Sequence, residues 1–97
     1  MARVDRSARA EIDLIEIWTA IGRDDPVAAD RQLDRIDEAC KILAKHPHAG
    51  KRRDDLTPGL RFYPVGNYLI FYIPRGNGVA VARVLHGARD YRQEFFD

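Results

Sequence analysis

The chain has 97 residues, of which 45% are hydrophobic, and its formal net charge at pH 7 is +1. This length predicts one domain over residues 1–97, and the single cysteine, Cys40, excludes both an internal disulfide and a thiolate cluster around a metal. No stretch approaches the roughly 18 apolar residues of a membrane span, and the Met-Ala-Arg start lacks the apolar core of a secretion signal. We therefore expect a soluble, cytoplasmic protein that does not associate with membranes.

The N-terminal half predicts two helices. After a candidate short strand at Arg3-Val4, a helix begins near Ser7, and its apolar face consists of Ala10, Leu14, Ile17, Trp18 and Ile21. Asp25 and Pro26 then supply an N-cap and a favourable first residue for a second helix, which ends before Pro47. Because the link between the two helices is short, we expect them to lie side by side and antiparallel.

The first helix carries a second apolar stripe, formed by Ala8, Ile12 and Ile15 on nearly the opposite side. In one interpretation this stripe meets the sheet while the first stripe meets the second helix. In the other interpretation it stays exposed and receives a partner protein. Trp18 is compatible with both, and we expect its side chain in the core.

The C-terminal half predicts an antiparallel meander. After an exposed charged loop at residues 51–55, extended segments are expected at residues 60–65, 68–73 and 79–85. The connections are a Gly66-Asn67 turn and a longer glycine-rich loop at residues 74–78. The middle segment is apolar on both faces, which indicates that helices cover one face and other residues cover the opposite face. The predicted fold class is therefore α+β: an antiparallel helical hairpin packed on a three- to four-stranded antiparallel sheet.

Charge is distributed unevenly along the chain. No Asp or Glu lies between Leu56 and Arg89, whereas four arginines occur from Arg61 to Arg89. We expect these guanidinium groups to present positive charge to solvent or to an acidic partner. The alternative for any one of them is an ion pair with a carboxylate of the N-terminal half.

Few residues favour catalysis. Cys40 lies in the apolar stripe of the second helix and is expected to be an inert packing residue, and the three histidines are too loosely spaced for a metal site. The isoelectric point near 7.9 is low for a dedicated nucleic-acid-binding domain. A metal-independent ribonuclease stays open, because arginines with a general acid and base can surround an RNA phosphate. The residues of the required types are Arg61, Arg83, His86, Arg89 and Tyr91.

Strand alternation opposes this ribonuclease. Arg83 and His86 are an odd number of residues apart, so they point to opposite faces of a strand unless a bulge intervenes. His86 is more simply interpreted as a strand-end residue whose ring fixes the following turn through a hydrogen bond.

Five motifs in order resemble a ParE-type toxin of the RelE/ParE superfamily over essentially the whole chain. They are Ala10-x-x-Asp13-Leu14-x-x-Ile17-Trp18, Leu43-x-x-His46-Pro47-x-x-Gly50, Gly59-Leu60-Arg61, Val65-Gly66-Asn67-Tyr68-Leu69-Ile70-Phe71-Tyr72, and Arg83-Val84-Leu85-His86-Gly87-Ala88-Arg89-Asp90.

The resemblance implies a type II toxin–antitoxin pair, in which a ParD-like antitoxin holds the toxin inactive and no cofactor or metal is required. The residues expected to contact the antitoxin are Ile12, Ile15, Arg61, Arg83 and Arg89. The residues expected to contact the target of the toxin are His86, Arg89, Phe95 and Phe96.

Two activities occur in the superfamily that the chain resembles: inhibition of DNA gyrase in the ParE branch and cleavage of ribosome-bound mRNA in the RelE branch. The nuclease branch places an arginine directly after the tyrosine of the middle strand, whereas Leu69 follows Tyr68 here. A lost guanidinium removes a charge-assisted hydrogen bond worth about 1.5–3 kcal/mol. The nuclease branch also uses a tyrosine near the C-terminus, where this chain has Phe95 and Phe96, with Tyr91 as the candidate substitute. We therefore expect a non-enzymatic gyrase inhibitor, with mRNA cleavage as the alternative and a non-toxic member that only binds its partner as a third hypothesis.

Overall fold

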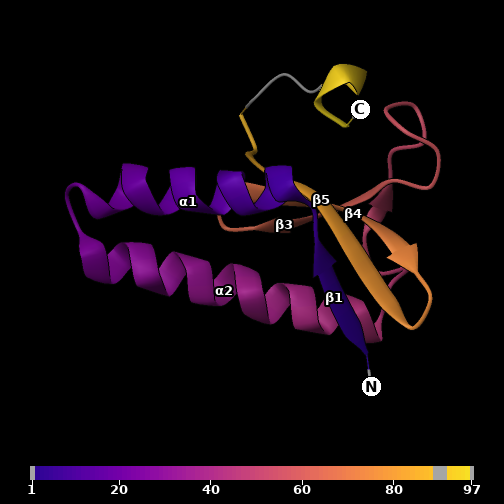
Figure 1. Cartoon of the computed structure of the whole chain (residues 1–97), viewed down its shortest axis with the longest axis horizontal. Coiled ribbons are helices and arrows are strands. Elements are labelled where there is room, and N and C mark those ends of the chain that lie inside the picture. The colour runs from indigo at the N-terminus through magenta and orange to yellow at the C-terminus, as the bar shows by residue number, and fades with distance from the viewer. Residues whose placement is uncertain (1, 89–91, 97) are drawn as a thin grey trace.

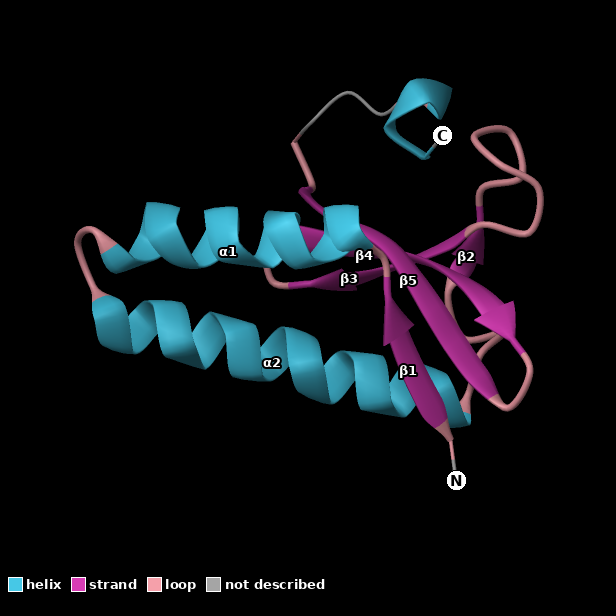
Figure 2. Ribbon diagram, viewed as in Figure 1, coloured by secondary structure: helices cyan, strands magenta, loops and turns pink. Residues whose placement is uncertain are grey.

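Two helices pack against one face of a five-stranded sheet (Figures 1 and 2). The structure is a computed structural model that describes residues 2–88 and 92–96. Its elements in chain order are β1 (Arg3–Arg6), α1 (Ala8–Gly22), α2 (Pro26–Lys45), β2 (Lys51–Arg52), β3 (Arg61–Val65), β4 (Tyr68–Arg75), β5 (Gly78–His86) and the 3-10 turn η1 (Gln93–Phe96). None of the helices in the described residues is long and apolar enough to cross a membrane.

The sheet is mixed rather than wholly antiparallel. Its strand order is β1-β5-β4-β3-β2, and β1 pairs with β5 in parallel while the other neighbours are antiparallel. The predicted α+β class is confirmed, but the number of strands and the parallel pair correct the expectation. β1 has four residues and β2 has two, so neither is long enough to show a strand pattern in the sequence.

The helical hairpin begins and ends as predicted. Ser7 caps α1, where its Oγ accepts a hydrogen bond of 3.0 Å from the backbone N–H of Ala10. Asp25 caps α2 in the same way at Ala28, and Pro26 occupies the first helical position. The two helices lie side by side and run in opposite directions (Figure 1).

The sheet is covered on both faces, as the apolar middle strand indicated. On the helix side, Ile70 and Tyr72 of β4 pack with the buried faces of α1 and α2. On the other side, Phe71 and Leu85 pack with residues of the loop between β2 and β3 and of η1. The buried or partly buried residues of this outer cluster are Leu56, Leu60, Phe62, Leu69, Phe71, Ile73, Ala82, Leu85, Phe95 and Phe96.

Both hairpin turns depend on glycine. Gly66 (φ +59) precedes Asn67 in the turn between β3 and β4, and Gly76 (φ +55) precedes Asn77 in the turn between β4 and β5. The second turn has two residues because the strands extend to Arg75 and from Gly78. The expectation of a longer loop at residues 74–78 is therefore wrong.

The border strands of the sheet are short and charged. β1 reads Arg-Val-Asp-Arg and β2 reads Lys-Arg. Pro64 lies in the part of β3 that extends beyond its pairing with β2, and proline has no N–H to donate to a further strand. Both borders thus carry features that discourage pairing with another chain.

Candidate protein-binding face of helix α1 and strand β5

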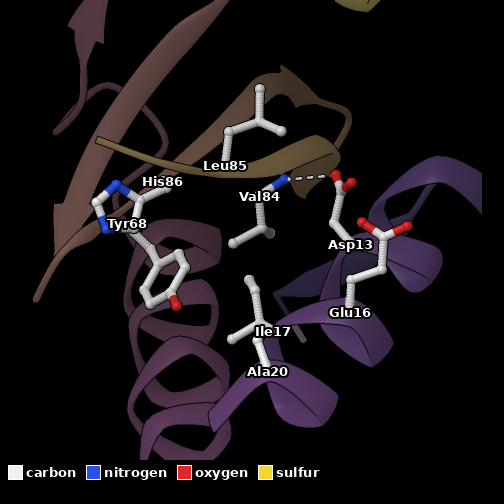
Figure 3. Close-up of a pocket in the computed structure, with 8 residues that line it drawn as sticks. All are labelled: Asp13, Glu16, Ile17, Ala20, Tyr68, Val84, Leu85 and His86. Atoms are coloured by element: carbon white, nitrogen blue, oxygen red, sulfur yellow. Dashed lines mark hydrogen bonds between the residues drawn. The ribbon is translucent and has the colours of Figure 1, made fainter. Parts of the chain in front are cut away.

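Helix α1 closes the edge of β5 where β1 ends. β1 pairs with β5 from Gly78 to Val81. Beyond that point the N–H of Ser7 donates to the carbonyl of Val81 (2.9 Å), and its hydroxyl donates to the carbonyl of Ala82 (2.7 Å). The Asp13 carboxylate then accepts a 3.0 Å hydrogen bond from the N–H of Val84 (Figure 3). One face of α1 therefore takes the place of a neighbouring strand.

Asp13 also holds the guanidinium of Arg83. Nε of Arg83 donates to Oδ2 of Asp13 at 2.8 Å and Nη2 donates to Oδ1 at 2.9 Å, so the pair is bidentate. Both residues are only 5% exposed. The hydrogen bond from Arg83 to Asp13 is the main reason that the pKa of the guanidinium is raised.

The ion pair corrects one expectation about charge. Arg83 does not present an unmatched positive charge, because a carboxylate of the N-terminal half neutralises it, as the alternative interpretation stated. The role of Asp13 in this ion pair was not expected from the sequence. The signal was available, since Asp13 lies three residues from Ala10 and four from Ile17, on the buried face of the helix.

Arg83 further connects the C-terminal turn to the sheet. A register shift in the pairing of β4 with β5 skips Ala82, and Arg83 follows this bulge. Nη1 of Arg83 donates to the carbonyl of Phe95 at 3.0 Å, and the guanidinium carbon lies 5.9 Å from the centre of the Phe95 ring. The ring of Phe96 packs 4.9 Å from that of Phe71. The two phenylalanines predicted to contact the target are thus partly packed in the outer cluster.

The described candidates for RNA cleavage lie in separate places. Nη1 of Arg61 donates to the carbonyls of Gly50 (2.8 Å) and His48 (3.3 Å), so its guanidinium holds the loop that follows α2. His86 lines a hollow beside α1, whereas Arg83 contacts Phe95 of the outer cluster. The regular pairing after the bulge keeps Arg83 and His86 on opposite faces, as alternation predicted. Arg89 and Tyr91 lie outside the described residues.

His86 has the turn-fixing role that the sequence suggested. Its Nδ1 accepts a 3.1 Å hydrogen bond from the N–H of Ala88. Its ring also meets the ring of Tyr68 edge-on, with 5.4 Å between the centres. These contacts place His86 at the end of β5 as a structural residue.

Cys40 is inert, as expected. Its side chain is 1% exposed, and burial raises the pKa of the thiol to about 11. Within residues 2–88 and 92–96, no three His, Cys, Asp or Glu side chains gather in a way that could hold a metal ion.

The second apolar stripe of α1 faces solvent. Ile12 is 48% exposed and Ile15 is 66% exposed, and Ala8 is exposed as well. The stripe does not meet the sheet, because the opposite face of α1 packs on both α2 and β5. The interpretation that it stays exposed is therefore confirmed.

Trp18 borders this stripe instead of lying in the core. Its side chain is 39% exposed, and its indole N–H donates to the Asp30 carboxylate of α2 at 2.8 Å. The expectation of a core tryptophan is wrong, because the ring covers the side of the hairpin where α1 meets α2.

A hollow of about 180 Å³ lies between α1 and the end of β5 (Figure 3). The Asp13 and Glu16 carboxylates stand on one side and the Tyr68 and His86 rings on the other. Apolar side chains lie between them, and the complete lining is Asp13, Glu16, Ile17, Ala20, Tyr68, Val84, Leu85 and His86. The exposed stripe of α1 and this hollow adjoin each other, since Glu16 lies four residues, about one helical turn, after Ile12. Together they form a surface suited to contact with another protein.

Comparison with known proteins relates the chain to one family. Residues 4–91 match the model of the ParE toxin of the type II toxin–antitoxin system parDE. Toxin ParE3 of Caulobacter vibrioides is 33% identical over 88 residues, which cover 90% of this chain and 88% of that protein. Toxin RelE2 of the same organism is 34% identical over 89 residues, covering 92% of this chain and 99% of that protein. A solved structure of the chromosomal ParDE system from P. aeruginosa has the same fold, with a TM-score of 0.73, 20% identity, and coverage of 89% of this chain and 96% of that one.

Proposed function

Because the chain belongs to the ParE family of toxins from type II toxin–antitoxin systems, we propose that a ParD-like antitoxin neutralises it by docking on the exposed face of α1. When released, the toxin inhibits DNA gyrase and so stops replication. The observation that supports the docking site is the exposure of Ile12 and Ile15 on the side of α1 that the rest of the described fold leaves uncovered.

The stripe has the form of a helix-recognition surface. Ala8, Ile12 and Ile15 are spaced by four and three residues, so they form one continuous row along α1. An amphipathic segment of a partner can bury such a row with its own apolar residues. Complete burial of an isoleucine is worth about 1.5–3 kcal/mol. Because about half of the surface of Ile12 and Ile15 is exposed, an antitoxin that covers them would gain about half of this free energy from each.

The docking site can be tested with matched substitutions of exposed isoleucines. Ile15→Ser and Ile12→Ser should each weaken the binding of the cognate antitoxin about tenfold, which corresponds to about 1.4 kcal/mol of lost burial. The control is Ile42→Ser, which removes an isoleucine of similar exposure, 52%, from α2. Binding is measured by calorimetry with the full-length antitoxin. Equal weakening by all three variants, or by none, would contradict the site on α1.

Gyrase inhibition is supported by the family and by the separation of the described nuclease candidates. A ribonuclease needs its acid, base and cations around one phosphate, but Arg61, Arg83 and His86 each serve a different part of the fold. Purified toxin should therefore inhibit supercoiling by gyrase, and added antitoxin should restore it. Growth arrest while supercoiling by gyrase stays unaltered would contradict the proposal that gyrase is the target.

Ribosome-dependent mRNA cleavage is a second candidate, favoured by the similarity to Toxin RelE2. Primer extension on ribosome-bound transcripts during growth arrest tests it, and cuts at the ribosomal A site would establish it. If expression of the chain without antitoxin leaves growth unaffected, the third hypothesis of a non-toxic binding protein holds.

A further inference from the structure

We infer that the hollow between α1 and the end of β5 is a binding pocket for one positively charged side chain, lysine or arginine, of the antitoxin segment that lies on α1. The inference rests on the proposed docking of the antitoxin, and it specifies which chemistry the antitoxin must present beside its apolar residues.

Charge is the first reason. Glu16 lines the hollow and is exposed, and it has no ion pair or hydrogen bond with the residues that the structure describes. The Arg83 guanidinium is close enough to interact electrostatically with Glu16. However, both oxygens of the Asp13 carboxylate already accept hydrogen bonds from that guanidinium. The charges of Asp13 and Arg83 cancel, so among residues 2–88 and 92–96 nothing pairs with the Glu16 carboxylate and it gives the hollow a negative charge.

The shape and lining are the second reason. Ile17, Ala20 and Val84 provide apolar surface, and the Tyr68 ring stands across the hollow from the two carboxylates (Figure 3). A lysine or arginine buries its methylene stem on apolar surface while its charged head reaches a carboxylate. An aromatic ring beside the head adds a cation–π contact. The hollow of about 180 Å³ is much larger than the roughly 10–15 Å³ that a single water needs, so it has room for one long side chain.

The backbone of β5 offers an additional acceptor. The N–H of Val84 bonds to Asp13, so it points away from β4 and toward α1. In an antiparallel pair the N–H and C=O of one residue point to the same side. The carbonyl of Val84 therefore also points toward α1 beside the hollow. A guanidinium or ammonium group has several N–H donors and can use this carbonyl together with Glu16.

The pocket favours a positively charged partner residue, whereas the stretch without acidic residues between Leu56 and Arg89 suggested an acidic partner. Glu16 adjoins Ile15 and lies four residues from Ile12, on the same exposed side of α1. A segment that buries the two isoleucines would thus place a neighbouring basic residue in the hollow. At this surface the complementary antitoxin residues are apolar and cationic instead of acidic.

Charge reversal at Glu16 tests the pocket. Glu16→Lys should weaken the binding of the full-length antitoxin at least about tenfold, and Glu16→Gln should weaken it less and reduce the dependence of affinity on salt. The control is Glu38→Lys, which reverses an exposed glutamate on α2. Each lysine and arginine of the α1-binding segment of the antitoxin is also changed to Glu, and one of these changes should restore the affinity of Glu16→Lys.

The outcomes separate the pocket from the docking site. If Glu16→Lys binds like the wild type while Ile15→Ser binds weakly, the pocket is overturned and docking on α1 stands. If Glu16→Lys binds weakly but no antitoxin charge reversal restores it, the pairing with a basic side chain is overturned. If neither Glu16→Lys nor Ile15→Ser weakens binding, the pocket and the docking site are both wrong. Circular dichroism of each variant verifies that the fold is intact.

Discussion

The Asp13 carboxylate joins α1 to β5 through three hydrogen bonds. Its two oxygens accept from Nε and Nη2 of Arg83 and from the N–H of Val84. The cost of burying both charges is offset because the pairing is bidentate and the carboxylate is fully bonded. The arginine in turn holds the carbonyl of Phe95, so one carboxylate supports contacts in three segments of the chain.

Removal of the Asp13 charge should therefore be strongly destabilising. Asp13→Asn keeps the size of the side chain but leaves the buried guanidinium of Arg83 without a counter-ion, and we expect the free energy of unfolding to fall by about 3–5 kcal/mol. Urea denaturation followed by circular dichroism measures this change. Asp24→Asn, at an exposed aspartate, should leave stability unaltered.

A double substitution distinguishes charge compensation from a general loss of packing. Asp13→Leu combined with Arg83→Met replaces both charges with apolar side chains of similar size, and it should recover much of the stability lost in Asp13→Asn. If the double variant is less stable than Asp13→Asn, the ion pair itself contributes net stability. The explanation by an uncompensated charge on Arg83 would then be wrong.

At the scale of elements, β1 is held by a close approach to β5. Arg3 pairs with Gly78, where the chain turns into β5 after Asn77. A Cβ at Gly78 would collide with the backbone of Arg3, including its carbonyl oxygen. Glycine at this position is thus needed for the parallel pair to form.

Gly78→Ala should detach β1 from the sheet. We expect the melting temperature to fall by several degrees, since about 1 kcal/mol corresponds to roughly 4–8 °C in a domain of this size. Amide hydrogen exchange from Val4 to Arg6 should become faster. Gly87→Ala is the milder comparison, because its added carbon would lie 3.3 Å from the nearest atom, the carbonyl oxygen of Asn67. Slow exchange in β1 of Gly78→Ala would contradict this role.

For the whole molecule, the sequence predicted the elements that carry strong periodicity. Helices α1 and α2, their antiparallel arrangement and the β3-β4-β5 meander all follow from regular apolar spacing and from caps such as Asp25. The two-faced apolar pattern of β4 correctly indicated that both sides of the sheet are covered. These features depend on local sequence, which is why they could be inferred.

Features that depend on distant pairs could not be inferred. Asp13 and Arg83 are seventy positions apart, and nothing local in the sequence joins them. The parallel pairing of β1 with β5 is also non-local, and the partial exposure of Trp18 depends on its bond to Asp30 of the other helix. The hollow at Glu16 needs β5, β4 and α1 together, so its lining appears only in three dimensions.

The nature of the border strands has a consequence for the toxin at high concentration. Ladders that grow from one molecule to the next require an outer strand with a long row of vacant donors and acceptors. Here one margin is a four-residue charged strand, and the other is a strand of two basic residues beside β3, whose part beyond the pairing with β2 contains Pro64. Molecules of this protein that accumulate would accordingly stay dispersed and avoid fibre formation.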